Sequence, residues 1–121
     1  MSIFTSELRD GPALLRGGNC EVPLEIAASP RARTRGLLGR DGIDGAILIT
    51  PSASVHTLGM RFTIDVAYLD SQLRVIGTHT LKPHRIGMPR RRARHVLEAA
   101  AGALAQWEIS VGTNLSVDLS R

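Results

Sequence analysis

This chain of 121 residues has one cysteine, one lysine and very few aromatic side chains. The lone Cys20 excludes an internal disulfide, and it leaves no set of cysteines for a structural zinc site. No apolar run approaches the roughly 20 residues that a membrane-spanning helix needs. The first ten residues also lack the basic start and long apolar stretch of a secretory signal, so a cytoplasmic protein is expected.

Acidic residues are missing from one long segment, residues 71–97, which carries seven Lys and Arg side chains. The excess positive charge is concentrated in a basic loop, residues 85–94, and above all in Arg90, Arg91, Arg92 and Arg94. Such a cluster could contact the phosphates of a nucleic acid or an acidic protein surface. A nucleic-acid platform usually adds stacking aromatic rings, however, and this loop has none. We therefore expect a solvated loop and no nucleic-acid partner.

The length and the 43% hydrophobic content are sufficient for one domain that needs no disulfide or metal ion. Residues 1–19 are expected to be loosely structured, because glycine and proline interrupt them, and residues 20–121 are expected to form a single β-rich domain. Ser29-Pro30 is typical of a helix start, with the helix ending near Gly39. A second, broken helix is expected over 99–107, and strand-like runs cover 22–28, 45–50, 53–57, 61–69, 73–80, 95–98 and 115–119.

This pattern predicts a mainly β, α+β fold, a compact antiparallel, barrel-like sheet of about seven short strands with one or two short helices. Residues 61–69 should form its central strand, because both faces of this run are apolar beyond Asp65. The turn at 70–72 should join that strand to 73–80 as an antiparallel hairpin.

Polar residues interrupt the apolar segment 54–70 at three places, His56, Arg61 and Asp65. A carboxylate inside a strand must find a partner, so Asp65 is expected to be partly buried and bonded to an Arg or a His. Glu98 lies in a similar apolar context, and two such carboxylates could serve as an acid and base pair. The alternative is that both are structural carboxylates, each satisfied by an Arg or by backbone donors.

Metal binding and serine hydrolysis are weaker interpretations. His56 and Met60, together with His79 or His84, could donate to a metal ion, but no metal-binding motif supports this, and we expect no metal and no cofactor. Ser52 and Ser54 lack the Gly-x-Ser-x-Gly turn of a nucleophilic serine.

Four ordered motifs carry a family resemblance, namely RTRGLLGR at 33–40, GAIL at 45–48, HTLGMRFTIDVAYLD at 56–70 and VLEAAAG at 96–102. The chain resembles domain of unknown function family 192 over about residues 22–119. The resemblance implies a compact, mainly β domain of bacteria and archaea, often with a signal peptide or lipoprotein anchor, and no assigned activity. Three positions depart from the family's pattern, Leu38 for Met, Thr63 for Pro and Gly112-Thr113 for Gly-Asp, and the missing signal peptide departs from it further.

The leading hypothesis is a binding or accessory module that is not an enzyme. It would hold a small anionic ligand or a partner peptide in a polar cleft lined by Arg35, Arg40, His56, Arg61, Asp65 and Glu98. The alternatives are a hydrolase-like enzyme using Asp65 and Glu98, or a nucleic-acid binder using the basic loop.

Overall fold

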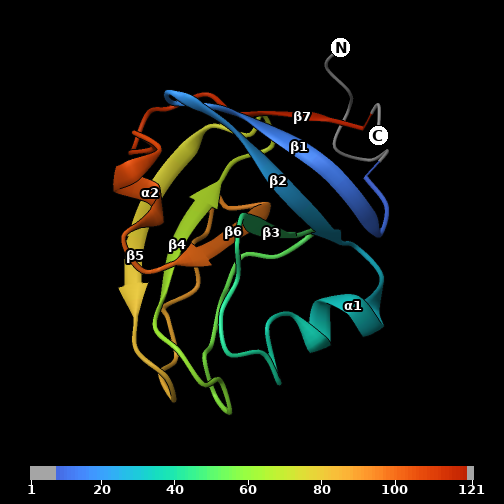
Figure 1. The fold of residues 1–121 in the computed structure, drawn as a ribbon, viewed down its shortest axis with the longest axis vertical. Coiled ribbons are helices and arrows are strands. Elements are labelled where there is room, and N and C mark those ends of the chain that lie inside the picture. The colour runs from blue at the N-terminus through green and yellow to red at the C-terminus, as the bar shows by residue number, and fades with distance from the viewer. Residues whose placement is uncertain (1–7, 120–121) are drawn as a thin grey trace.

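A computed structural model describes residues 8–119 and shows a seven-stranded mixed sheet with two short helices (Figure 1). The order of the strands in the sheet is β5-β4-β6-β3-β2-β1-β7. The elements are, in chain order, β1 Gly11–Gly17, β2 Cys20–Ala27, α1 Pro30–Arg35, β3 Ala46–Ile49, β4 Ile64–Leu69, β5 Val75–Leu81, β6 His95–Ala100, α2 Ala103–Gln106 and β7 Ser116–Asp118.

The predicted fold class is confirmed, with two refinements. Five of the six strand pairs are antiparallel, but β2 and β3 run parallel, and the sheet does not close into a barrel. The predicted hairpin is also confirmed, because β4 pairs with β5 on one side and with β6 on the other. Every residue of β4 is buried, as its two apolar faces require.

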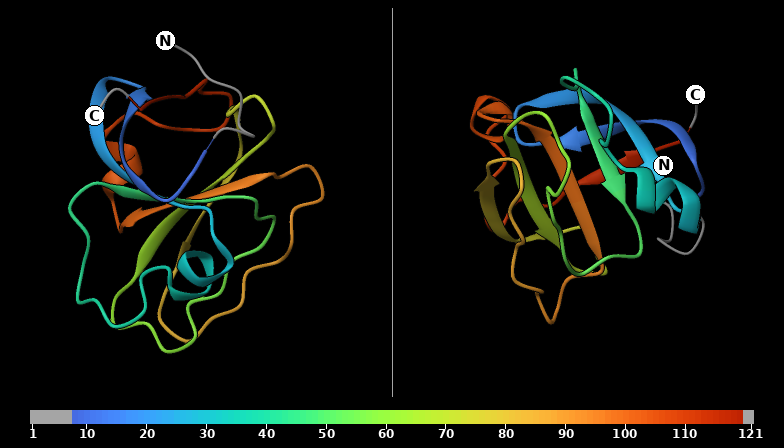
Figure 2. Two further views of the ribbon diagram at one scale, coloured as in Figure 1. Left: turned by 90° about the vertical axis from the view of Figure 1, so that its right-hand side faces the viewer. Right: turned by 90° about the horizontal axis from the view of Figure 1, so that it is seen from below.

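The middle of the sheet is covered on both faces, and Figure 2 shows the two layers from the side. One face, the α2 face, carries alternate residues such as Leu48, Leu69 and Leu97, which pack with β1, β2, β7 and α2. The other, the α1 face, carries Ile47, Val66 and their neighbours, which pack under α1 and the segments 50–62 and 82–94. Because successive strand residues point to opposite faces, each of β3, β4 and β6 contributes to both cores.

Two expectations for the chain were wrong. Residues 11–17, which the sequence predicts to be loosely structured, form β1, which pairs along its whole length with β2. The two-residue turn at Gly18-Asn19 closes this hairpin. Gly18 has a φ of +56°, and the carbonyl oxygen of Trp107 occupies the space in which a Cβ would lie, so a side chain would not fit there. The expected strand at 53–57 is a loop with one isolated bridge, from His56 to Ile86. Residues 1–7 of the expected loose segment lie outside the described residues.

Both helices are shorter than expected. Ser29 caps α1 as predicted, because its hydroxyl accepts a hydrogen bond from the Ala32 amide at 3.1 Å, but the helix ends at Gly36 rather than near Gly39. Asp10 in turn accepts from the Ser29 hydroxyl, which holds the pKa of this carboxyl below its usual value. α2 is a single turn. Among residues 8–119, no helix is long and apolar enough to cross a membrane.

Candidate functional site

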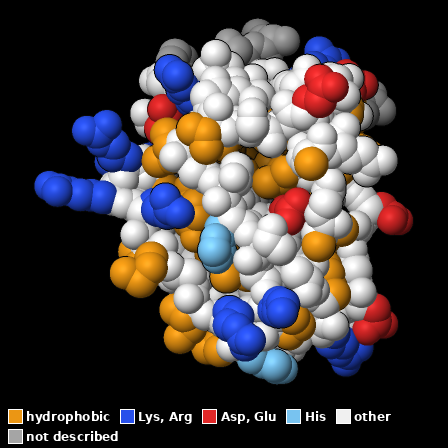
Figure 3. All heavy atoms as spheres, turned by 90° about the vertical axis from the view of Figure 1, so that its left-hand side faces the viewer, with side chains coloured by type: hydrophobic (Ala, Val, Ile, Leu, Met, Phe, Trp, Pro, Cys, Tyr) orange, Lys and Arg blue, Asp and Glu red, His pale blue; other side chains and the backbone are white. Residues whose placement is uncertain are grey.

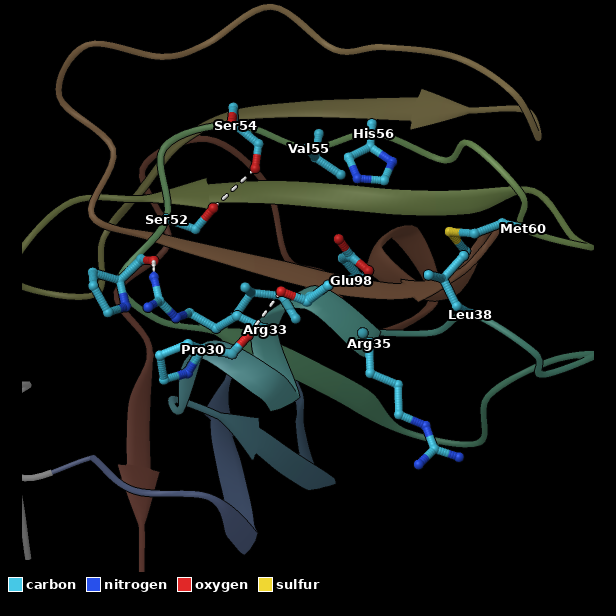
Figure 4. Close-up of a pocket in the computed structure, with 14 residues that line it drawn as sticks. Pro30, Arg33, Arg35, Leu38, Ser52, Ser54, Val55, His56, Met60 and Glu98 are labelled. Carbon is cyan, nitrogen blue, oxygen red and sulfur yellow. Dashed lines mark hydrogen bonds between the residues drawn. The ribbon is translucent and has the colours of Figure 1, made fainter.

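A pocket of about 340 Å³ opens on the α1 face, between α1 and the segment that follows β3 (Figure 4). This volume lies at the lower end of the range that small-molecule sites occupy. Its floor comes from β3 and β6. One wall comes from α1 and the residues that follow it, and the other comes from the segment 50–62. The lining residues are Pro30, Arg33, Thr34, Arg35, Gly36, Leu38, Ile49, Pro51, Ser52, Ser54, Val55, His56, Met60 and Glu98.

Glu98 is the only carboxylate among the described residues that line this pocket. The register of β6 places it opposite Ile47 on one side and Val66 on the other, so its strand neighbours on this face are apolar. Its side chain points into the pocket, it is only 7% exposed, and among the described residues no hydrogen-bond donor reaches it. Burial raises the pKa of Glu98 to about 7, because the charged form has lost water and gained no partner.

One end of the pocket is polar. Arg33 reaches across from α1 and donates from Nη1 to the carbonyl oxygen of Pro51 at 3.1 Å, while its Nε is buried with no partner among the described residues. Ser52 donates to the Ser54 carbonyl oxygen at 2.9 Å. Arg35 also lines the pocket, but Figure 4 shows its side chain extending away from the cavity.

The other end is largely apolar, with Leu38 and Met60 together beyond Glu98 in Figure 4. His56 lies above Glu98 from the opposite wall. Its Nδ1 accepts a hydrogen bond from the Leu58 amide at 3.3 Å, which leaves Nε2 to carry the proton of the neutral ring. The pocket therefore offers a carboxyl, an imidazole and a guanidinium around a partly apolar space.

The six predicted ligand-binding residues fall into separate places. Arg35, His56 and Glu98 line the pocket on the α1 face. Arg40 instead forms a two-point ion pair with Glu25, with distances of 3.0 and 2.8 Å, and this contact raises its pKa. Arg61 is exposed and contacts Asp41 at 3.2 Å.

Asp65 lies on the α2 face, so it does not meet Glu98. The register pairs Asp65 with Ala99 and Val66 with Glu98, and this places the two carboxyl groups on opposite faces of the sheet. Asp65 and Glu98 therefore cannot act together as the predicted acid and base pair. The expected Arg or His partner is also wrong, because Asp65 accepts from the Thr80 hydroxyl at 2.8 Å and from the amides of Gly102 and Leu104 at 2.9 and 3.4 Å. Asp65 thus caps α2, whose own N-cap residue is a glycine.

The basic loop is exposed, as expected. Arg90, Arg91, Arg92 and Arg94 all lie on the surface, and the guanidinium of Arg90 stacks over the ring of Tyr68 at 4.8 Å. Within residues 8–119, no three His, Cys, Asp or Glu side chains come close enough together to hold a metal ion.

The sequence reasoning missed the pocket's Arg33 and the contribution of its serines. One signal was available, since the Ser29-Pro30 helix start predicted a helix rich in arginine. The sequence does not predict which face of the sheet this helix covers.

Comparisons with known proteins bear on the family and the fold. The model of the DUF192 family, described as "Uncharacterized ACR", matches residues 13–117. The UPF0127 protein PH1112 of Pyrococcus horikoshii is 38% identical over 87 residues, which cover 68% of this chain and 76% of that protein.

Two solved structures share the fold. One is a Sinorhizobium meliloti protein described as a "putative transcription regulator", with a TM-score of 0.79, 21% identity, and coverage of 92% of this chain and 97% of that one. The second, a protein of unknown function from Novosphingobium aromaticivorans, has a TM-score of 0.73, 17% identity, and coverage of 96% of this chain and 91% of that one.

Proposed function

This chain belongs to the DUF192 family of uncharacterised proteins, and we propose that it is a binding module whose pocket on the α1 face takes a small ligand against Glu98. The ligand presents a hydrogen-bond donor to Glu98 and an anionic group to Arg33. Its apolar part lies toward Leu38 and Met60. A free amino acid and the end of a peptide both have this chemistry.

The observation that carries this proposal is the state of Glu98. A buried carboxyl without a hydrogen-bond partner destabilises a protein by several kcal/mol when it is ionised. Glu98 is nine-tenths buried and unpartnered within the described residues, yet it faces an open pocket rather than a closed core. A ligand that donates to this carboxyl would offset the cost, and the free energy gained would appear as affinity.

The position of Arg33 supports the anionic end of the ligand. Only one of its N–H groups has a bond to a described protein atom, the one to Pro51, so the guanidinium retains donors for a carboxylate. Because Arg33 and Glu98 come from different elements and line one cavity, a ligand with both a donor and an anionic group satisfies both of them.

Three matched compounds test the proposal. L-Leucine carries an amino group, a carboxylate and an apolar side chain, 4-methylpentanoate lacks the amino group, and 3-methylbutylamine lacks the carboxylate. At ten times its Kd, a ligand stabilises the folded state by about 1.4 kcal/mol, which is a shift of several degrees in the unfolding temperature of a domain of this size. We expect leucine to give the largest shift at pH 8.

Two variants and one control complete the experiment. Glu98→Gln and Arg33→Gln should each reduce the leucine shift, while Arg61→Gln should leave it unchanged because Arg61 lies outside the pocket. A shift that persists in Glu98→Gln, or the absence of a shift with all three compounds, would contradict the proposal.

Acid–base catalysis by Glu98 is a second candidate function. The observation that favours it is the pKa of about 7, since a catalytic acid or base works best when its pKa lies near the operating pH. His56 in the same pocket would then be the second proton carrier, in place of Asp65. NMR spectra of bound compounds after long incubation separate the two functions. Conversion by the wild type and not by Glu98→Gln supports catalysis, whereas recovery of the unchanged compound supports binding.

A further inference from the structure

Two large apolar side chains stand on the surface in the segment between β5 and β6. Ile86 is 74% exposed and Met88 is 77% exposed, more than any other large hydrophobic side chain in residues 8–119. Gly87 between them faces inward, where an added Cβ would meet Val55 at 2.9 Å and the Tyr68 hydroxyl at 3.0 Å. The backbone at Gly87 therefore packs closely against Val55 and Tyr68, and the side chains of Ile86 and Met88 face outward on either side of it.

Backbone hydrogen bonds fix this segment in place. The Gly87 amide donates to the Val55 carbonyl oxygen at 2.8 Å, and the Arg90 amide donates to that of Ala53 at 2.8 Å. The Thr57 amide donates to the Arg85 carbonyl oxygen at 2.8 Å as well. Ile86 and Met88 are thus presented on an ordered support, so that binding a partner costs little additional conformational entropy.

The same segment is strongly basic. Its six cationic side chains are Lys82, Arg85, Arg90, Arg91, Arg92 and Arg94, and residues 71–97 contain no Asp or Glu. All six are exposed, and none of them forms an ion pair with another part of residues 8–119. On the face shown in Figure 3, basic side chains stand out from the surface with exposed hydrophobic side chains beside them.

We propose that the segment 82–94 docks on an anionic phospholipid surface. Ile86 and Met88 enter the boundary between headgroups and acyl chains, and the surrounding arginines contact the lipid phosphates. This combination favours a lipid surface over a nucleic acid, because stacking on bases calls for aromatic rings and the segment has none. Charge complementarity selects the anionic lipid, and the two exposed aliphatic side chains select a bilayer rather than a polyanion.

Sedimentation with vesicles tests this proposal without reference to the pocket ligand. The protein is mixed with vesicles of phosphatidylcholine alone or of phosphatidylcholine and phosphatidylglycerol in equal amounts. We expect binding to the anionic vesicles only, and binding should weaken as salt increases. Neutralising Arg91 and Arg92 with Gln should lower the partition coefficient about fivefold for each residue.

The apolar contribution needs its own variant and control. Replacing Ile86 and Met88 with Ser should lower the partition coefficient at least tenfold, since each side chain loses burial in the lipid boundary. Val111→Ser is the matched control, because Val111 is 62% exposed on a turn outside the segment 82–94. It should bind as the wild type does. The circular dichroism spectrum and the unfolding temperature of each variant report whether it is folded.

Three results would overturn the proposal. The first is no sedimentation with the anionic vesicles, and the second is unchanged binding by the folded Ile86→Ser/Met88→Ser variant, which would indicate adsorption by charge alone. The third is tight binding of a 20-base-pair DNA duplex at physiological salt that weakens stepwise as Arg90, Arg91 and Arg92 are neutralised, which would assign the segment to nucleic acid.

Discussion

Asp65 and Glu98 lie on neighbouring strands, are each 7% exposed, and differ in almost everything else. Asp65 points to the α2 face and accepts three hydrogen bonds, two of them from the amides at the start of α2. Glu98 points to the α1 face, has no donor among the described residues, and has a pKa of about 7. Burial alone therefore does not identify a functional carboxyl. The two carboxyls differ in the number of hydrogen-bond donors that reach them. We therefore interpret Asp65 as a structural residue and Glu98 as a residue of the candidate site.

The largest expected effect comes from removing the satisfied carboxyl. Asp65→Ala leaves two amides at the start of α2 and the Thr80 hydroxyl without their acceptor, and hydrogen bonds to a charged group contribute about 1.5–3 kcal/mol each. We expect the free energy of unfolding to fall by about 4–5 kcal/mol in urea titration. Thr80→Val removes a single one of the three bonds and should lower the free energy of unfolding by about 1.5 kcal/mol. A loss below 1 kcal/mol in Asp65→Ala would remove the distinction between the two carboxyls.

The next effect concerns the pH dependence that Glu98 imposes. Its pKa is raised from 4.5 to about 7, so the folded state binds this proton more tightly than the unfolded state does. The free energy of unfolding should therefore fall as the pH rises from about 4.5 to about 7, by about 3 kcal/mol from this group.

Comparison with Glu98→Gln isolates that contribution. Burial lowers the pKa of His95, and its effect has the opposite sign, since stability increases as the pH rises through the imidazole's unfolded value. The difference between the wild type and Glu98→Gln cancels the effect of His95. We expect the variant to be the more stable of the two at pH 8 and to lose that advantage at pH 4. Parallel curves for the two proteins would show that Glu98 is not desolvated.

A smaller effect on stability tests whether α1 and α2, which cover opposite faces of the sheet, unfold independently. Ser29 caps α1, which roofs Glu98, and Ser29→Ala should cost about 1 kcal/mol. Hydrogen exchange at the amides of α1 should become faster while the amides at the start of α2 stay protected. Arg31→Ala, at an exposed residue of α1 that does not line the pocket, is the control and should have little effect. Faster exchange at both helices would mean that the two faces do not unfold independently.

The smallest effect is expected at a predicted site residue that the structure places elsewhere. Arg61 and Asp41 form an exposed pair, with side chains that are 59% and 87% exposed, and such pairs contribute about 0–0.5 kcal/mol. Arg61→Ala should leave both the stability and the ligand response of the pocket nearly unchanged. A loss of ligand response in this variant would extend the site beyond the α1 face.

Local sequence patterns predicted those parts of the fold that depend on neighbouring residues. The apolar run in residues 61–69 and the turn at 70–72 were sufficient for the hairpin of β4 and β5, and Ser29-Pro30 was sufficient for the start of α1. β1 was missed because its glycines and proline obscured a strand that depends on pairing with β2 and β7.

The candidate site depended on distant pairings that local patterns do not contain. The face on which Glu98 lies is set by its register with Val66, 32 residues earlier in the chain. The partners of Asp65 include an amide 37 residues away, at Gly102. A shift of a single residue in the register of β4 and β6 would have exchanged the surroundings of these two carboxyls.

The parallel pairing of β2 and β3 has a consequence for where a pocket can form. Two neighbouring parallel strands cannot be joined by a tight turn, so the chain must travel back along the sheet before β3 begins. Residues 28–45 form this crossover connection, and α1 lies in its first part. The segment that covers Glu98 is therefore part of the connection between β2 and β3, which this strand order requires. Substitutions can change the lining of the cavity, but the connection itself persists for as long as β2 and β3 remain side by side.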